Sequence, residues 1–256
     1  MRTPSQITAV ILAGGQGTRI RHLLPECPKP MALVLGRPFL EWIVRFLILQ
    51  GIRDIILSTG YKAEQIESHF GASQIPGATI RCVREKIPRG TAGGFLEAIA
   101  GAATPDAWLI CNGDSLVLTS LGPLFETLRM QTVAGALLGI PVGDASNYGT
   151  LECDSQGTLH RFAEKRPGRG LVNAGVYLFR CNPCNGFPDG LPLSFEKDVF
   201  PRLLADKAKL HVVPATGPFL DIGTPKTFGL AERFIAGNPA FFSPAENHAE
   251  PSAILS

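Results

Sequence analysis

Short apolar runs alternate with amphipathic stretches through the first half of the chain. The apolar runs, each followed by polar or glycine residues, cover 8–14, 53–60, 78–85 and 107–114. Apolar residues recur at helical spacing in the stretches that follow them, at 39–52, 63–70, 91–102 and 121–131. Short strands that alternate with amphipathic helices are typical of β-α units on a mostly parallel sheet. We therefore predict an α/β fold whose strands are buried on both faces.

The pattern changes from about Ala134, where one strand-like segment follows another. These segments cover 134–142, 149–154, 157–164 and 171–180, with glycine-containing turns between them. A helix over 194–205, a strand over 209–215, the segment 218–225 and a final helix over 226–237 complete the pattern. We expect a strand-rich subregion laid against the first half, because no flexible linker separates two independent domains. The last residues, 238–256, lack periodicity and are expected to be flexible or loosely docked.

Composition changes this picture little. The chain has 256 residues, 45% of them hydrophobic and 18% charged, which suits a compact protein with a substantial core. Its formal net charge of +2 gives no overall basic field, so nucleic acid is not an expected partner. The N-terminus does not resemble a signal peptide and no apolar run is long enough to span a bilayer. We therefore expect no membrane association and a cytoplasmic location.

The six cysteines are scattered, mostly inside apolar runs, and we interpret them as reduced small hydrophobes. Cys181 and Cys184 form a single C-x-x-C, "CNPC". With no second pair and no histidine at a suitable spacing, this motif gives weak support for zinc, and we interpret it as structural chance.

A glycine-rich loop follows the first apolar run. In "GGQGTR", residues 14–19, successive glycines allow backbone N–H groups to turn toward a ligand, as phosphate-binding loops require. The loop is not a P-loop, and Ile20 stands where a dinucleotide fingerprint has its third glycine. Arg19 ends the loop, and Lys29 follows between Pro28 and Pro30, which restrict its backbone. This pattern favours an anion site, whereas Arg21 is interpreted as structural.

The loop and its neighbours resemble the signature of sugar-1-phosphate nucleotidylyltransferases, L-A-G-G-x-G-T-R followed by P-K-P. Further landmarks of that family follow in order between Ile7 and Phe228: "REKIPRGTAGG", "CNGDS", "NYGTL", "FAEKR", "VNAGVY" and "FLDIGTP". The chain is most similar to the D-glycero-D-manno-heptose 1-phosphate guanylyltransferase branch, with mannose-1-phosphate guanylyltransferase next.

This resemblance implies a Rossmann-like three-layer nucleotidyltransferase fold, with a mostly parallel central sheet and a strand-rich sugar-binding subregion. It implies one domain over 1–237, with a nucleotide-binding part to about 133 and a sugar-binding part from about 134. The expected reaction joins GTP and a sugar 1-phosphate with Mg²⁺ as cofactor, giving a GDP-sugar and pyrophosphate. Because the attacking phosphate oxygen is already anionic, such chemistry requires neither a general base nor a covalent nucleophile.

By the same resemblance, Arg19, Lys29 and Asp114 are expected to be catalytic, and Asp114 and Asp221 to bind the metal. Arg19 would contact the triphosphate, and Lys29 would bridge the attacking phosphate and the α-phosphate. Both aspartates follow apolar runs, so they are expected at the carboxyl ends of strands, where ligands of open α/β sheets bind. Turn capping is the alternative role for each aspartate.

The resemblance also implies two sets of substrate-binding residues. Those expected to bind the nucleotide are Leu12, Ala13, Gly14, Gly15, Gly17, Thr18, Arg19, Glu85, Gly90, Thr91 and Asn112. Those expected to bind the sugar phosphate are Tyr148, Gly149, Glu164, Lys165 and Asn173. Glu85 is expected to select guanine, since a carboxylate can accept from both N1–H and N2–H₂ of the base. An exposed Glu85 with no role in binding is the alternative, and Arg89 stands where many relatives carry an apolar residue.

Three other functions stay open at this level. The same chemistry could use mannose 1-phosphate, or UTP and another hexose 1-phosphate, because one hydroxymethylene changes affinity only modestly. A non-catalytic relative could bind nucleotide sugars, although the full set of charges disfavours it. A dinucleotide-dependent dehydrogenase is disfavoured by the missing third glycine and by "STGYK" after the second strand. A chain of this size also allows a homo-oligomer.

Overall fold

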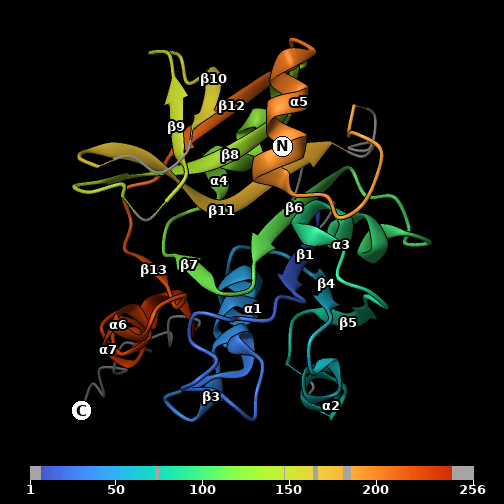
Figure 1. Cartoon of the computed structure of the whole chain (residues 1–256), viewed down its shortest axis with the longest axis vertical. Coiled ribbons are helices and arrows are strands. Elements are labelled where there is room, and N and C mark those ends of the chain that lie inside the picture. Colours follow the sequence, from blue (N-terminus) through green and yellow to red (C-terminus); the bar gives the residue numbers. More distant parts are fainter. Residues whose placement is uncertain (1–6, 73–74, 147, 164–166, 181–185, 244–256) are drawn as a thin grey trace, which may run out of the picture.

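A nine-stranded sheet forms the centre of the molecule (Figure 1). The computed structural model describes residues 7–72, 75–146, 148–163, 167–180 and 186–243. Four strands of the sheet are parallel and lie in the order β6-β1-β4-β5. Their bounds are β1 Ile7–Ala13, β4 Asp54–Thr59, β5 Thr79–Arg84 and β6 Ala107–Asn112. The carboxyl ends of all four therefore meet at one edge.

The same sheet continues into the second half of the chain. Strand β11 (Gly170–Arg180) is antiparallel to β6 on one side and to β8 (Val133–Val142) on the other. Strand β12 (Lys209–Pro214) runs parallel to β8. The hairpin of β9 (Thr150–Cys153) and β10 (Leu159–Ala163) joins through the first half of β11. Hydrogen bonding between β6 and β11 thus makes the two halves continuous.

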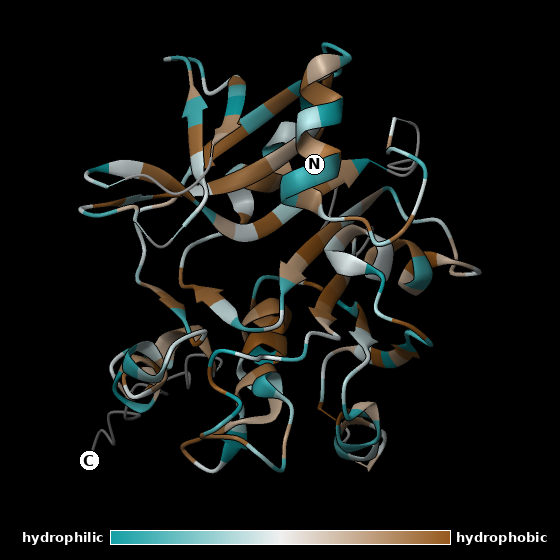
Figure 2. Cartoon of the chain, viewed as in Figure 1, coloured by the Kyte–Doolittle hydropathy of each residue, from teal (hydrophilic) through white to brown (hydrophobic). Residues whose placement is uncertain are grey.

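Helices cover both faces of the sheet, which gives three layers. One core cluster contains side chains of α1 (Phe39–Leu49), α2 (Ala63–Ala72) and α4 (Gly122–Glu126). The other contains side chains of α3 (Gly90–Ile99) and α5 (Phe200–Ala205). The central strands are hydrophobic along their length, as Figure 2 shows, because alternate side chains enter opposite clusters. The predicted α/β class with three layers is confirmed.

Short elements connect this framework. They are η2 (Lys29–Met31), β2 (Leu33–Val34), β3 (Arg37–Pro38), β7 (Ser115–Val117), η3 (Thr127–Arg129), η4 (Phe195–Val199), β13 (Phe219–Asp221), α6 (Pro225–Phe228), α7 (Ala231–Ala236) and η5 (Pro239–Phe241). No helix in the described ranges has both the length and the apolar character needed to cross a membrane.

Three predicted helices differ from the observed ones. The helix predicted over 121–131 is the short α4 followed by the 3₁₀ turn η3. The helix predicted over 194–205 begins as the π-helical turn η4, in which the Val199 N–H donates to the Ser194 carbonyl at 3.0 Å. Pro201 follows at the start of α5, where its missing N–H is tolerated. The helix predicted over 226–237 is two short helices, because α6 ends at Phe228 and α7 begins at Ala231.

The first residues of the predicted tail are packed. Pro239–Phe241 form η5, and Phe242 is only 4% exposed. The Phe242 ring lies edge-on to Trp42 of α1, with ring centroids 5.2 Å apart. Residues 244–256 lie outside the described part of the chain, as do Cys181 and Cys184. Four described cysteines carry free thiols: Cys27, Cys82, Cys111 and Cys153.

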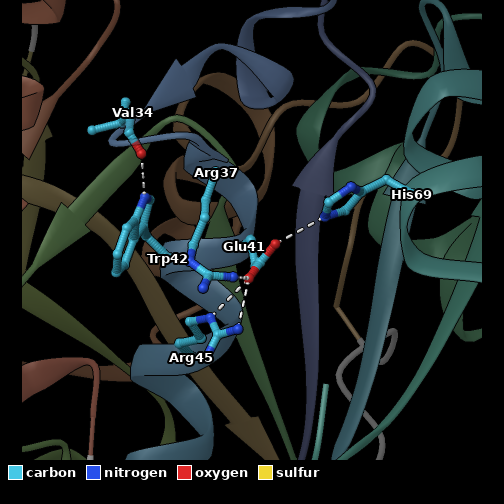
Figure 3. A network of polar contacts seen from close by, with 6 residues as sticks. All are labelled: Val34, Arg37, Glu41, Trp42, Arg45 and His69. Atoms are coloured by element: carbon cyan, nitrogen blue, oxygen red, sulfur yellow. Dashed lines mark hydrogen bonds and ion pairs between the residues drawn. The ribbon is translucent and has the colours of Figure 1, made fainter. Parts of the chain in front are cut away.

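A buried carboxylate ties α1 to α2 (Figure 3). Glu41 is 5% exposed, and its oxygens accept hydrogen bonds from Arg37 and Arg45 at 2.8 Å and contact His69 at 2.9 Å. Burial alone would raise the pKa of Glu41, but the hydrogen bonds from Arg45, His69 and Arg37 hold it below its usual value. The network fixes α1, which in turn holds the segment that follows Lys29 through a bond from Trp42 Nε1 to the Val34 carbonyl.

Glu41→Gln should destabilise the fold by about 2 kcal/mol at pH 7, because charge-assisted hydrogen bonds to a buried group are lost. A group with a lowered folded pKa stabilises above its unfolded pKa, so the difference from wild type should shrink as pH falls below about 4.3. Urea unfolding at several pH values measures both effects. The matched control is Glu126→Gln, which breaks an exposed pair with Arg129 and should change stability by less than about 0.5 kcal/mol. Equal losses in the two variants would contradict the role of burial.

Candidate functional site

The glycine loop leaves the carboxyl end of β1 and forms one wall of a cavity. Gly17 has φ +58°, and a side chain there would also approach the Cβ of Lys29 to 3.0 Å. A Cβ on Gly14 would lie 2.5 Å from Oε1 of Glu85. Glycine is therefore required at these two positions by backbone conformation and by close packing against Lys29 and Glu85.

The Lys29 ammonium forms an ion pair with the Asp114 carboxylate, which lies 85 residues away in the chain. Lys29 opens η2 after the extended Pro28, and its side chain is only 11% exposed. Asp114 lies two residues after the end of β6, at the edge where the carboxyl ends of the parallel strands meet. A cation buried to this degree requires such a partner.

Asp221 is held next to Asp114 by backbone pairing. It ends β13, where it is the register partner of Ser115 in β7, and the Ile222 N–H donates to the Asp114 carbonyl at 2.9 Å. Burial and the charge of Asp114 raise the pKa of Asp221, while Lys29 and Arg19 oppose that rise. Two carboxylates and two cations therefore converge, as the sequence predicts.

These elements surround a cavity of about 590 Å³. All eleven residues that the sequence assigns to nucleotide binding line it, together with Lys29 and Asp114. Further lining residues, which the sequence did not single out, are Gln16, Pro30, Gly60, Tyr61, Lys86, Ile87, Pro88 and Gly223. Its lining includes residues of the glycine loop and of the loop after β5.

Glu85 stands at the start of the loop after β5. Its N–H donates to the Thr59 carbonyl at 2.8 Å, which extends the sheet by one residue. Its carboxylate accepts from the Arg89 N–H at 3.1 Å and from Ser58 Oγ at 3.3 Å. Burial raises the pKa of Glu85, and these two hydrogen bonds oppose the rise. A carboxylate has about four acceptor sites, so two remain for a ligand. The Arg89 guanidinium pairs with Glu97 at 3.1 Å.

The N-terminus of α3 is closed to phosphate by the chain itself. The N–H groups of Ala92 and Gly93 both donate to the Leu193 carbonyl, at 2.9 and 3.1 Å. Gly90 has φ +76°, and a Cβ there would lie 2.5 Å from that same oxygen. The Thr91 hydroxyl accepts from the Phe195 N–H at 3.0 Å. The amides of Ala92 and Gly93 are therefore satisfied by the chain itself and are not free to bind an anion.

Three of the five residues assigned to the sugar phosphate, Tyr148, Gly149 and Asn173, lie outside the lining of the cavity. Burial and the charge of Asp221 raise the pKa of Tyr148, and Arg19 lowers it, which places Tyr148 near both groups. The Gly149 carbonyl accepts from the Asn173 N–H at 3.0 Å. Asn173 lies on β11, next to the strand that leads to Asp114. The other two, Glu164 and Lys165, lie outside the described residues.

Residues 21–26, which follow the glycine loop, contact the residues after β4, and the sequence did not predict these contacts. The Arg21 guanidinium lies over the Tyr61 ring, 4.7 Å from its centroid, so Arg21 stabilises the loop after β4. Lys62 Nζ donates to the Pro25 carbonyl at 2.8 Å, and Gln65 donates to the Glu26 carbonyl at 2.7 Å. The position of "STGYK" after a parallel strand was the available signal, because such loops adjoin the loop of the neighbouring strand.

Known proteins share this architecture and sequence. A family model described as "Nucleotidyl transferase" matches residues 8–237. Mannose-1-phosphate guanylyltransferase of Mycobacterium tuberculosis is 36% identical over 242 residues, which are 92% of this chain and 67% of that protein. D-glycero-alpha-D-manno-heptose 1-phosphate guanylyltransferase of Aneurinibacillus thermoaerophilus is 34% identical over 232 residues, 88% of this chain and 96% of that protein.

A solved structure gives the same result. The crystal structure of HddC from Yersinia pseudotuberculosis, complexed with GMP-PN, aligns with a TM-score of 0.77 at 28% identity and covers 89% of this chain and 99% of that chain. The family model spans the glycine loop, the paired aspartates and the whole central sheet. The chain therefore belongs to the nucleotidyl transferase family.

Proposed function

We propose that the protein transfers GMP from GTP to a sugar 1-phosphate and releases pyrophosphate. The observation that carries the proposal is the arrangement of one cavity: a glycine loop with Arg19 and Lys29 at one part, and Glu85 at another. Asp114 joins this cavity to Asp221. The relatives named above as guanylyltransferases support the same reaction.

In this reaction a phosphate oxygen of the sugar 1-phosphate attacks the α-phosphorus of GTP. The bond from that phosphorus to the β-bridging oxygen breaks, and pyrophosphate leaves with the bonding electron pair. The attacking oxygen is already anionic, so no side chain has to remove a proton. Arg19 and Lys29 stabilise the charge that accumulates on the phosphates, and the glycine loop supplies backbone donors. Lys29 is held in place for this role by Asp114.

The carboxylates of Asp114 and Asp221 fit a divalent cation, which we propose to be Mg²⁺. Asp221 is buried beside a second carboxylate and has a raised pKa, an arrangement that a bound cation would relieve. No group of three or more His, Cys, Asp or Glu side chains is placed for a metal in the described chain. Two carboxylates leave room for water and phosphate oxygens, which Mg²⁺ prefers. When bound, the ion would neutralise phosphate charge.

Glu85 is proposed to select guanine. Its carboxylate faces the glycine loop, since a Cβ on Gly14 would lie 2.5 Å from its Oε1. The hydrogen bonds from Ser58 and Arg89 fix its orientation. Guanine presents two adjacent donors to such an acceptor, whereas uracil and thymine present a donor between two carbonyl oxygens.

The sugar is proposed to be D-glycero-D-manno-heptose 1-phosphate, bound by Tyr148, Gly149, Asn173 and by Glu164 and Lys165. Mannose 1-phosphate is the second candidate, because the Mycobacterium tuberculosis relative named for that sugar is 36% identical. The two sugars differ by one hydroxymethylene, so the same polar groups could hold either ring.

Pyrophosphate release with purified protein and Mg²⁺ tests the reaction. Across the four nucleoside triphosphates, kcat/KM should be at least about 100-fold higher for GTP than for UTP, since unpaired polar groups are heavily penalised. The heptose 1-phosphate should exceed mannose 1-phosphate by roughly tenfold, the usual scale for one extra carbon. Tight GTP binding with no turnover of any sugar phosphate would favour a non-catalytic nucleotide-sugar-binding protein instead.

Glu85→Gln should lower kcat/KM for GTP by about 10- to 100-fold, because a charge-assisted acceptor for two donors is replaced by one carbonyl oxygen. UTP turnover should fall less, so the ratio of the two kcat/KM values should shrink. The matched control is Glu97→Gln, a nearby carboxylate that pairs with Arg89 and does not line the cavity. An unchanged preference for GTP in Glu85→Gln would remove the assignment.

Asp221→Asn should raise the Mg²⁺ concentration that gives half-maximal turnover by at least about tenfold, because one anionic ligand is lost. The titration is run at saturating GTP and sugar 1-phosphate. Asp154→Asn serves as the control, since Asp154 caps the turn between β9 and β10 and lies far in sequence from the carboxylate pair. A reduced maximal rate with an unaltered Mg²⁺ requirement would assign Asp221 to positioning rather than to metal binding.

A further inference from the structure

A further carboxylate, that of Glu196, lies between the regions proposed to bind the nucleotide and the sugar. The sequence did not single it out. Glu196 belongs to η4, and its Oε2 accepts from Ser194 Oγ at 2.7 Å and from Thr91 Oγ1 at 3.2 Å. Its Oε1 accepts from the Tyr177 hydroxyl at 3.0 Å. Since an ionised carboxylate can only accept, all three hydroxyl protons are directed toward it.

The Tyr177 hydroxyl links Glu196 to Asn173 by hydrogen bonds. Asn173 Nδ2 donates to the Tyr177 oxygen at 2.7 Å, and Asn173 Oδ1 accepts from the Gly175 N–H at 3.0 Å. These two bonds fix the orientation of the Asn173 side-chain amide. Its second N–H therefore points in one fixed direction. Asn173 is one of the residues proposed to bind the sugar.

A bulge in β11 makes this contact possible. Between Asn173 and Tyr177 the strand has four steps, while its partner β8 has two, from Gly139 to Leu137. In a regular strand, residues four apart are about 13 Å from one another, too far for a hydrogen bond. Gly175, with φ +72°, lies within the bulge and has no space for a side chain, because a Cβ would lie 2.5 Å from Asn112 Nδ2.

The middle of the network is buried, whereas its ends lie at the two regions proposed to bind the substrates. Tyr177 is fully buried, and burial together with Glu196 raises its pKa, so the hydroxyl keeps its proton as a donor. Its ring packs against Phe195 and Phe200, with centroids 5.3 and 5.0 Å away. At one end Thr91 lines the cavity, and at the other Asn173 is half-buried. A network that served packing alone would not need polar groups at both substrate regions.

We propose that Glu196 is a positioning residue that couples the nucleotide and sugar regions by holding Thr91 and, through Tyr177, Asn173 in one fixed arrangement. This inference rests on the proposed function. A displacement of Thr91 on nucleotide binding changes its bond to Glu196, which changes the acceptor available to Tyr177 and so the orientation of the Asn173 amide. The sugar 1-phosphate therefore meets an ordered Asn173 when GTP is in place.

A double-mutant cycle of Thr91→Val and Tyr177→Phe tests the coupling, because each substitution removes one hydroxyl and keeps the shape of the side chain. With GTP saturating, Thr91→Val should raise the KM for the sugar 1-phosphate about fivefold in the wild-type background, within the range of coupling between contacting groups. In the Tyr177→Phe background the same substitution should raise it less than about twofold. The cycle is repeated with Glu196→Gln, where the effect of Thr91→Val should also disappear.

Thr127→Val is the control, since it removes a buried hydroxyl that donates to Leu124 on the opposite face and should leave both KM values unchanged. Thermal unfolding of each variant separates lost folding from lost coupling. Additive effects of Thr91→Val and Tyr177→Phe on the KM for the sugar, in an enzyme that turns over, would overturn the coupling alone. Absence of turnover in wild type would instead contradict the proposed function.

Discussion

The ion pair between Lys29 and Asp114 is the interaction on which the site depends. Lys29 is nearly enclosed, so removal of its partner would leave a buried charge without compensation. Asp114 in turn stands beside the buried Asp221, and the two carboxylates are tolerable together because Lys29 and Arg19 supply opposite charge. Removal of any one of these charged side chains would leave another without the opposite charge that stabilises it. The segment η2 and the ends of β6 and β13 are thereby fixed relative to one another.

Much of this arrangement could be predicted from the sequence, because a parallel sheet converts local pattern into position. Continuous apolar runs identify the strands, which are buried on both faces, and the residues that follow them must meet at one edge. Asn112 ends a parallel strand, whereas the glycine loop, Asp114 and Glu85 follow parallel strands, and all of them line the same cavity. Their convergence needs no knowledge of long-range contacts beyond the sheet itself.

The remaining parts depend on contacts that no local pattern encodes. Glu196 of the π-helical turn η4 contacts Thr91 of α3, 105 residues away, and Ser194 caps that turn by accepting from the Lys197 N–H. Gly229 divides the last predicted helix although the apolar spacing continues through it. Phe242 packs on Trp42 although its own neighbours have no periodicity. In each case tertiary packing decides between local structures of similar propensity.

Closure of α3 by the Leu193 carbonyl also explains how one cavity can distinguish the two ends of a nucleotide. A free helix N-terminus would attract phosphate, and a phosphate there would lie close to the Glu85 carboxylate. A neutral carbonyl satisfies the Ala92 and Gly93 amides without adding charge, so Glu85 stays available to donors. Arg19 and Lys29 line the cavity together with the glycine loop. Under the proposed function, Glu85 would meet the base of the nucleotide, and the glycine loop with Arg19 and Lys29 would meet its phosphates.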